Sequence, residues 1–246
     1  SIFKDTFLQN LRVNNEKTSY VASRAIRKNI FGGDHPYGAE AEVSHVQQIL
    51  RDDQIADHHK NFQHGDVFVS GNINDKSIEM IRTHFSAFKT SLAVPPNHVI
   101  TPPNNLYEHI EKPGSVQSSI RLGHKMVLRD HEDYYYILLL NHILGGFFGS
   151  RLMKNIREEK GLTYGIHSSL HILQHDGYIV IGADVNGSNR ELAIDEIKKE
   201  LARLSNQLIP ERELETARNH FIGALQSELA TPFAHGDKIK NIALFN

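Results

Sequence analysis

The first third of the chain has the hydrophobic pattern of a series of helices. Apolar side chains recur there every three or four positions, the spacing that places them on one face of a helix. The segments with this pattern are 2–12, 19–31 and 76–86; two shorter helices are predicted at 43–50 and at 52–62, the latter because Asp52 and Asp53 lie at the positive end of its dipole. One apolar run between them, Val67-Phe68-Val69, is predicted to form a short strand.

The rest of the chain is patterned as strands in neighbouring pairs with helices between them. Strands are predicted at 106–111, 116–127, 163–173 and 177–185, and helices at 132–144, 150–159, 189–206 and 211–230. This order is typical of an α+β fold with a largely antiparallel sheet.

Prolines interrupt both patterns between these two regions. Pro95-Pro96 and Pro102-Pro103 resist both helix and sheet, so we predict a linker over residues 95–104. It would separate a first domain over 1–94 from a second over 105–246. We expect both ends to be cut from a longer chain, because the sequence starts without Met and stops on an apolar segment.

Composition narrows the classes of function without identifying one. The 246 residues are 39% hydrophobic and 23% charged, as in an ordinary soluble protein. The net charge of −2 offers no basis for binding nucleic acid, and no apolar run is long enough for membrane insertion. The absence of Cys excludes thiolate zinc sites and is compatible with both periplasm and cytoplasm.

The sixteen histidines invite a metal hypothesis that their spacing does not support. Neither H-x-x-E-H nor H-E-x-x-H occurs. His167, His171 and His175 lie four residues apart on a strand-like segment, where four residues span about 13 Å, too far for one shared metal. His58 and His59, with His64 nearby, lack a placed third ligand. Both groups are predicted to be polar surface.

The segment 144–165 reads LGGFFGSRLMKNIREEKGLTYG. By spacing alone its glycines predict a tight joint between two helices, because both the dinucleotide fingerprint and the Lys of a phosphate loop are missing. The whole run closely resembles the insulinase-type (pitrilysin) family of zinc peptidases, whose members carry a glycine-rich joint, "SRL" and "IRE-x-x-GL-x-Y". Residues 33–38 resemble the family's "HPYG" turn, 52–62 its "DL-x-x-F" helix and 67–71 its "V-x-G" strand.

The resemblance implies two similar α+β domains per half-molecule, with two halves that close around a peptide. Zinc in this family lies in the catalytic half, held by the two His of H-x-x-E-H and a Glu on a helix before the HPYG turn. The family's spacing places Gln9 or Asn10 at that Glu, and the closest acid is Asp5. An amide substitutes poorly for a carboxylate on zinc, so we expect no metal in this chain, and zinc in a catalytic partner or missing half.

The resemblance also implies a functional pair, Arg157 and Tyr164. In the family an Arg and a Tyr seven residues apart project from the non-catalytic half towards the zinc site. A fixed cation and a phenolic donor would orient the scissile carbonyl and stabilise developing oxyanion charge. The alternative is structural: Arg157 pairs with Glu158 or Glu159, and Tyr164 packs in the core with Ile166.

These features predict a zinc-free partner subunit or half of a two-part peptidase, made of two insulinase-type domains of which the first is incomplete. It would bind unfolded peptides and supply Arg157 and Tyr164 to a zinc-bearing homologous subunit or half, and alone it would be inactive. Two alternatives stay open. One is a fragment of a self-sufficient zinc endopeptidase whose metal motif lies upstream, and the other is a catalytically silent scaffold with the same fold.

Overall fold

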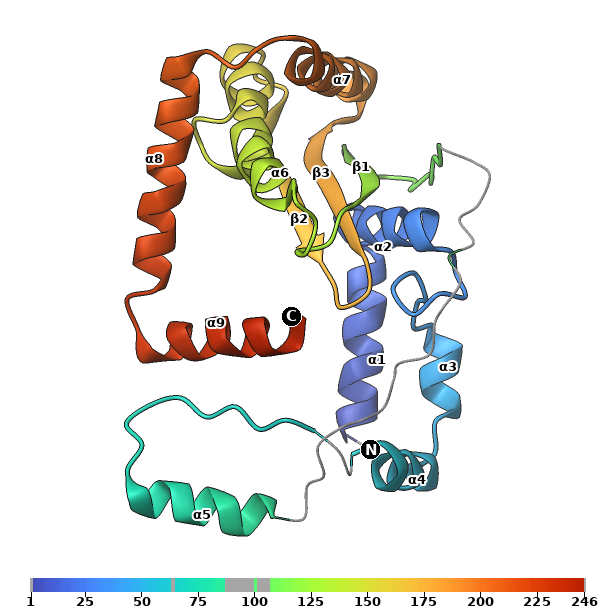
Figure 1. Ribbon diagram of the computed structural model, residues 1–246. Helices are drawn as coiled ribbons and strands as arrows, with labels where there is room; N and C mark the ends of the chain where they lie inside the picture. Colours follow the sequence, from blue (N-terminus) through green and yellow to red (C-terminus); the bar gives the residue numbers. More distant parts are fainter. Residues whose placement is uncertain (1, 63–64, 87–99, 101–106, 246) are drawn as a thin grey trace. The chain divides into compact units, whose positions relative to one another are not determined.

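The computed structural model describes residues 2–62, 65–86, 100 and 107–245 (Figure 1). The chain forms two compact units that interleave along the sequence. One comprises Ser1–Leu8, Ala41–His98 and Leu225–Asn246, and the other Gln9–Glu40 and Val99–Ala224. The helices α1 (Ile2–Asn15) and α8 (Glu211–Glu228) contribute residues to both units.

The predicted linker lies mostly outside the described residues, since only residue 100 of 95–104 is described. The domain bounds 1–94 and 105–246 therefore stay a prediction. None of the helices in the described ranges combines the length and the apolar character needed to cross a membrane.

The first unit is helical in its described part. It contains α3 (Val43–Gln48), α4 (Arg51–Asn61), α5 (Asp75–Phe85) and α9 (Pro232–Phe245). Asn74 caps α5, because its side-chain oxygen accepts the N–H of Ser77 at 3.0 Å. The strand predicted at Val67-Phe68-Val69 is wrong: the segment is half exposed and pairs with no strand in the described residues. A strand forms only against a hydrogen-bonded neighbour.

The second unit is built on an antiparallel sheet of β1 (Gln117–Met126), β2 (Thr163–Ile172) and β3 (Gly177–Asn186), in the order β1-β3-β2. Its helices include α2 (Thr18–Phe31), α6 (Tyr134–Asn141) and α7 (Arg190–Asn206). The α+β prediction is confirmed. The strand predicted at 106–111 is wrong over its described residues, 107–111, which join no ladder.

Alternate residues of the strands cover the two faces of the sheet. On one face the core contains the strand residues Ile120, Ile166, Ile181 and Val185. Helical residues pack on them: Leu152 and Ile156, and Ala193 and Ile197 of α7. The other face packs against α2, which lies beside β1 and β3 (Figure 1). There Tyr178 and Val180 cluster with Ile30 and Phe31. The strand predicted at 163–173 is confirmed as β2, in which Ile166 is buried and His167 and His171 lie on the opposite side.

The turn that follows α2 depends on two glycines. Gly32 ends the helix with φ 91°, and its carbonyl accepts the N–H of His35 at 3.3 Å. A Cβ on Gly38 would lie 2.1 Å from the oxygen of Gly32, so no larger residue fits without moving the backbone. His35 stacks on Phe31 with ring centroids 5.5 Å apart, which fixes the turn against the core.

Candidate functional site

Arg157 lies on η2 (Met153–Glu159), a π-helical segment that ends in a glycine cap. Gly161 adopts the left-handed conformation with φ 61°. The N–H of Leu162 then donates to the oxygen of Ile156 at 3.0 Å. Since Ile156 and Leu162 are both buried, this cap fixes the connection from η2 into β2.

The guanidinium of Arg157 covers an aromatic ring. Its central carbon lies 4.6 Å from the ring centroid of Phe148, a cation–π distance. The predicted alternative, an ion pair with Glu158 or Glu159, is wrong: in the part of the chain that the structure describes, Arg157 forms no ion pair with either. Its charge therefore remains available to another group.

Tyr164 projects from an irregularity in β2. Thr163 pairs with Val185 and Ile166 with Ala183, so Tyr164 and Gly165 both oppose Asp184. This two-against-one arrangement is a β-bulge, a feature that changes the direction of a side chain. Strict alternation from buried Ile166 would turn Tyr164 into the core, whereas it is 92% exposed. The predicted core-packing alternative is therefore wrong.

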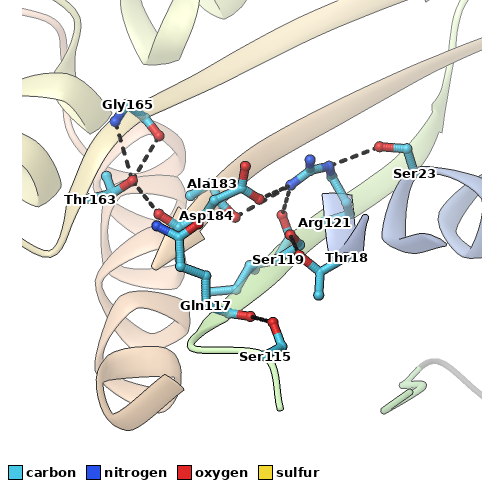
Figure 2. Close-up of polar contacts among 11 residues, drawn as sticks. Thr18, Ser23, Ser115, Gln117, Ser119, Arg121, Thr163, Gly165, Ala183 and Asp184 are labelled. Carbon is cyan, nitrogen blue, oxygen red and sulfur yellow. Dashed lines mark hydrogen bonds and ion pairs between the residues drawn. The ribbon is translucent and has the colours of Figure 1, made fainter. Parts of the chain in front are cut away.

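A hollow of about 330 Å³ lies beside Tyr164. It is lined mainly by polar residues: Gln117, Thr163, Tyr164, Asp184 and Asn186 come from the ends of the three strands, and Asn189 from the 3-10 turn η3 (Gly187–Asn189) that follows β3. Figure 2 shows the hydrogen bonds that hold several of these residues. The Asp184 carboxylate accepts from Arg121 Nη1 at 3.4 Å, so its charge is partly balanced.

The glycine-rich segment before η2 packs on a strand. In η1 (His142–Gly146), a Cβ on Gly145 would lie 2.5 Å from the backbone nitrogen of Ser168 in β2. The predicted joint between helices is thus also a close approach to the sheet. Asn141 donates to the oxygen of Ser168 at 3.3 Å and so ties the same segment to β2.

Replacing Gly145 with Ala is expected to lower the free energy of unfolding by about 1–3 kcal/mol, because the added methyl group overlaps backbone that cannot move freely. Gly223→Ala is the matched control: apart from its own helix α8, no atom of the described residues lies within 4 Å of its Cβ position, so helix propensity should make it stabilising. Urea unfolding of both variants measures the difference. Equal stabilities would contradict the close approach.

Two histidines that were not predicted as a pair meet beside this segment. His142 Nε2 lies 3.0 Å from His220 Nδ1, and the ring of Phe147 stacks on His142 with centroids 4.7 Å apart. The residues are 78 positions apart, so no local pattern could have paired them. Burial, and secondarily the neighbouring His220, lower the pKa of His142 below its usual 6.5.

The lowered pKa of His142 predicts acid-sensitive stability. At pH values between the folded pKa of His142 and 6.5, the unfolded chain binds more protons than the folded one. The contribution of His142 to the free energy of unfolding is therefore complete above about pH 6.5 and declines as the pH falls below it. His142→Gln is expected to flatten the dependence of unfolding free energy on pH between about 5 and 7. The exposed His131→Gln serves as control. A slope as steep in His142→Gln as in the unsubstituted protein would refute the assignment.

The "SRL" arginine has a structural role. Arg151 Nε and Nη2 donate to the two carboxylate oxygens of Glu213 at 2.7 and 2.8 Å. The hydrogen bond from Arg151 lowers the pKa of Glu213, although burial opposes it, and the same bond raises the pKa of Arg151. Leu152, the last residue of the motif, is fully buried in the core.

The residues of this chain do not fit a zinc site in its described part. Gln9 and Asn10 lie exposed on α1, and no group of three His, Asp or Glu residues that could hold a metal occurs among the described residues. His171 stacks on Tyr178 with centroids 4.7 Å apart, and His58 stacks on Phe62. His64 lies outside the described residues, so for it the surface assignment stays a prediction.

Comparison with known families gives a match over most of the chain. Residues 52–221 match the family model described as the peptidase M16 inactive domain. A curated relative, the uncharacterized zinc protease YmxG of Bacillus subtilis, is 28% identical over 168 residues. That alignment covers 66% of this chain and 39% of the relative, so the chain spans well under half of the relative's length.

Solved structures show the same fold. A peptidase M16 inactive domain from Pseudomonas fluorescens superposes with a TM-score of 0.83 at 24% identity, over 99% of this chain and 60% of that one. A protease from Helicobacter pylori gives a TM-score of 0.77 at 20% identity, over 98% of this chain and 63% of that one. At these identities the likeness concerns the fold alone.

Proposed function

Because the chain belongs to the family of peptidase M16 inactive domains, we propose that it is the zinc-free half of a two-part peptidase. In this proposal it binds unfolded peptides, in part by strand addition to its sheet, and lends Arg157 and Tyr164 to the active site of a zinc-bearing homologous half. The metal chemistry would come from that half, since the described residues of this chain do not fit a zinc site.

The observation that carries the proposal is the exposure of Tyr164. The phenol of Tyr164 is 92% exposed on a bulge, so burial of the ring does not explain its outward position. A ligand outside the chain explains that position better. Arg157 supports it, because its guanidinium rests on an exposed ring and not on a carboxylate. Together the two groups could donate to a peptide carbonyl as negative charge develops on it.

The test is reconstitution of peptide cleavage. The full-length protein is assayed against a quenched fluorogenic peptide alone, and then mixed with a zinc-bearing subunit of the same family. The proposal expects cleavage only in the mixture, at a rate above that of the zinc-bearing subunit alone.

Two other outcomes would replace the proposal. Cleavage by the full-length protein alone, abolished by a chelator, would identify a self-sufficient zinc endopeptidase. Assembly with the zinc-bearing subunit without any gain in cleavage would favour the silent scaffold.

A further inference from the structure

The bulge that carries Tyr164 is tied to both sides of the ladder by one hydroxyl group. Thr163 Oγ1 lies 2.7 Å from the carbonyl oxygen of Asp184 on β3 and 2.9 Å from that of Gly165 on its own strand. The N–H of Gly165 donates to the same oxygen at 3.2 Å. A hydroxyl has one proton and two lone pairs, so it can accept from Gly165 while it donates to one carbonyl. Figure 2 shows these three contacts around the bulge.

The opposing strand is held at the same level by a largely buried arginine side chain. Arg121 Nη1 donates to the oxygens of Ile120 at 2.8 Å and Ala183 at 3.3 Å, and Arg121 Nε donates to Ser23 Oγ on α2 at 3.1 Å (Figure 2). The arginine side chain is only 11% exposed. Because β3 is fixed at Ala183 and Asp184, the hydroxyl of Thr163 has a rigid acceptor to bond.

Among the described residues of its own unit, none packs firmly on the ring of Tyr164, since the side chain is almost entirely exposed. The direction of an exposed side chain depends on its own backbone, and here that backbone is the bulge. A displacement of about 1 Å in a catalytic group can cost roughly a hundredfold in rate. The geometry of the bulge therefore sets how well Tyr164 can meet a substrate.

We propose that Thr163 is a positioning residue: its hydroxyl holds the bulge in the form that directs Tyr164 outward. The inference rests on the proposed function, in which Tyr164 acts on a bound peptide. It assigns Thr163 no contact with the substrate.

The test is a double-mutant cycle in the reconstituted full-length complex with the fluorogenic peptide. Thr163→Val removes the hydroxyl at nearly constant shape, and Thr163→Ser keeps it. The valine variant should lower kcat by about tenfold to a hundredfold with KM little changed, and the serine variant should restore most of the rate. In a Tyr164→Phe background, Thr163→Val should change kcat by less than about twofold, because the group it positions is gone.

The matched control is Thr216→Val on α8. In the described part of the chain, the hydroxyl of Thr216 bonds the carbonyl of Arg212 within the helix, at 2.8 Å, and no other group, so this variant should leave kcat unchanged. Normal kcat in Thr163→Val together with a reduced kcat in Tyr164→Phe would overturn the positioning role and leave the proposed function intact. Normal kcat in Tyr164→Phe would overturn both, and the two failures are thus distinguishable.

A measurement on the unsubstituted protein covers the case in which Thr163→Val fails to fold. The amide of Gly165 should exchange its hydrogen at least about tenfold more slowly than in an unfolded chain, because Thr163 accepts its hydrogen bond. Exchange of the Gly165 amide at the unfolded rate would overturn the proposal.

Discussion

Tyr164→Phe is expected to reduce kcat of the reconstituted complex by about 10²–10³, the usual cost of losing one donor to a developing oxyanion. Folding should be unaffected, because the ring is 92% exposed and a substitution at such a site changes stability by less than about 0.5 kcal/mol. The measurements are steady-state cleavage of a fluorogenic peptide and thermal unfolding. Phenylalanine keeps the ring, so the change isolates the hydroxyl.

Tyr135→Phe is the matched control for this experiment. Tyr135 is a similarly exposed tyrosine on α6, and its substitution should leave both kcat and stability unchanged. A Tyr164→Phe complex as active as the control complex would refute the assignment of Tyr164 to the active site.

A pair of substitutions distinguishes two roles of Arg157, packing on the ring of Phe148 and action on the bound peptide. If Arg157 only covers the ring of Phe148, Arg157→Ala and Phe148→Leu should change kcat equally. Each removes the same cation–π contact, which is worth about 0.5–1 kcal/mol. If the guanidinium acts on the peptide, Arg157→Ala should lower kcat far more than Phe148→Leu. The ratio of the two kcat values decides between these roles.

Helices with a clear apolar period could be predicted from the sequence, because that period places side chains such as Leu11 of α1 and Ile30 of α2 in buried positions. Each helix predicted from that period is present in the structure, though the segments at 132–144 and 150–159 pass into π-helical turns. The helix α9 was not predicted, yet a signal existed: Thr231 caps the N–H of Ala234 at 3.2 Å, and Pro232 occupies the first helical position.

The candidate site was only partly accessible to sequence reasoning. The resemblance selected Arg157 and Tyr164, but periodicity alone would have buried Tyr164 beside Ile166, because a bulge is not visible as a pattern of hydrophobic positions. The contacts of Arg121 with Ala183 and of His142 with His220 join residues more than 60 positions apart. Such contacts follow from the order of strands and helices in space, which no local spacing encodes.

The largest loss of stability is expected at the "SRL" arginine. Arg151→Met should lower the free energy of unfolding by about 2–4 kcal/mol, because it leaves the Glu213 carboxylate, which is 28% exposed, without its bidentate partner. Urea unfolding at pH 7 measures the effect. Arg190→Met is the control: Arg190 pairs with Glu191 at 2.8 Å on the surface, where an ion pair is worth less than about 1 kcal/mol.

Acid titration then identifies the pair as the cause of the loss. The pKa of Glu213 is lowered in the folded protein, so the stabilisation is present above the unfolded pKa of about 4.5 and is lost as the pH falls through the folded value. Arg151→Met should therefore be closer in stability to the unsubstituted protein at pH 3 than at pH 7, and Glu213→Gln should behave alike. A loss in Arg151→Met that is equally large at both pH values would show that packing of the arginine side chain, and not its charge, stabilises this part of the fold.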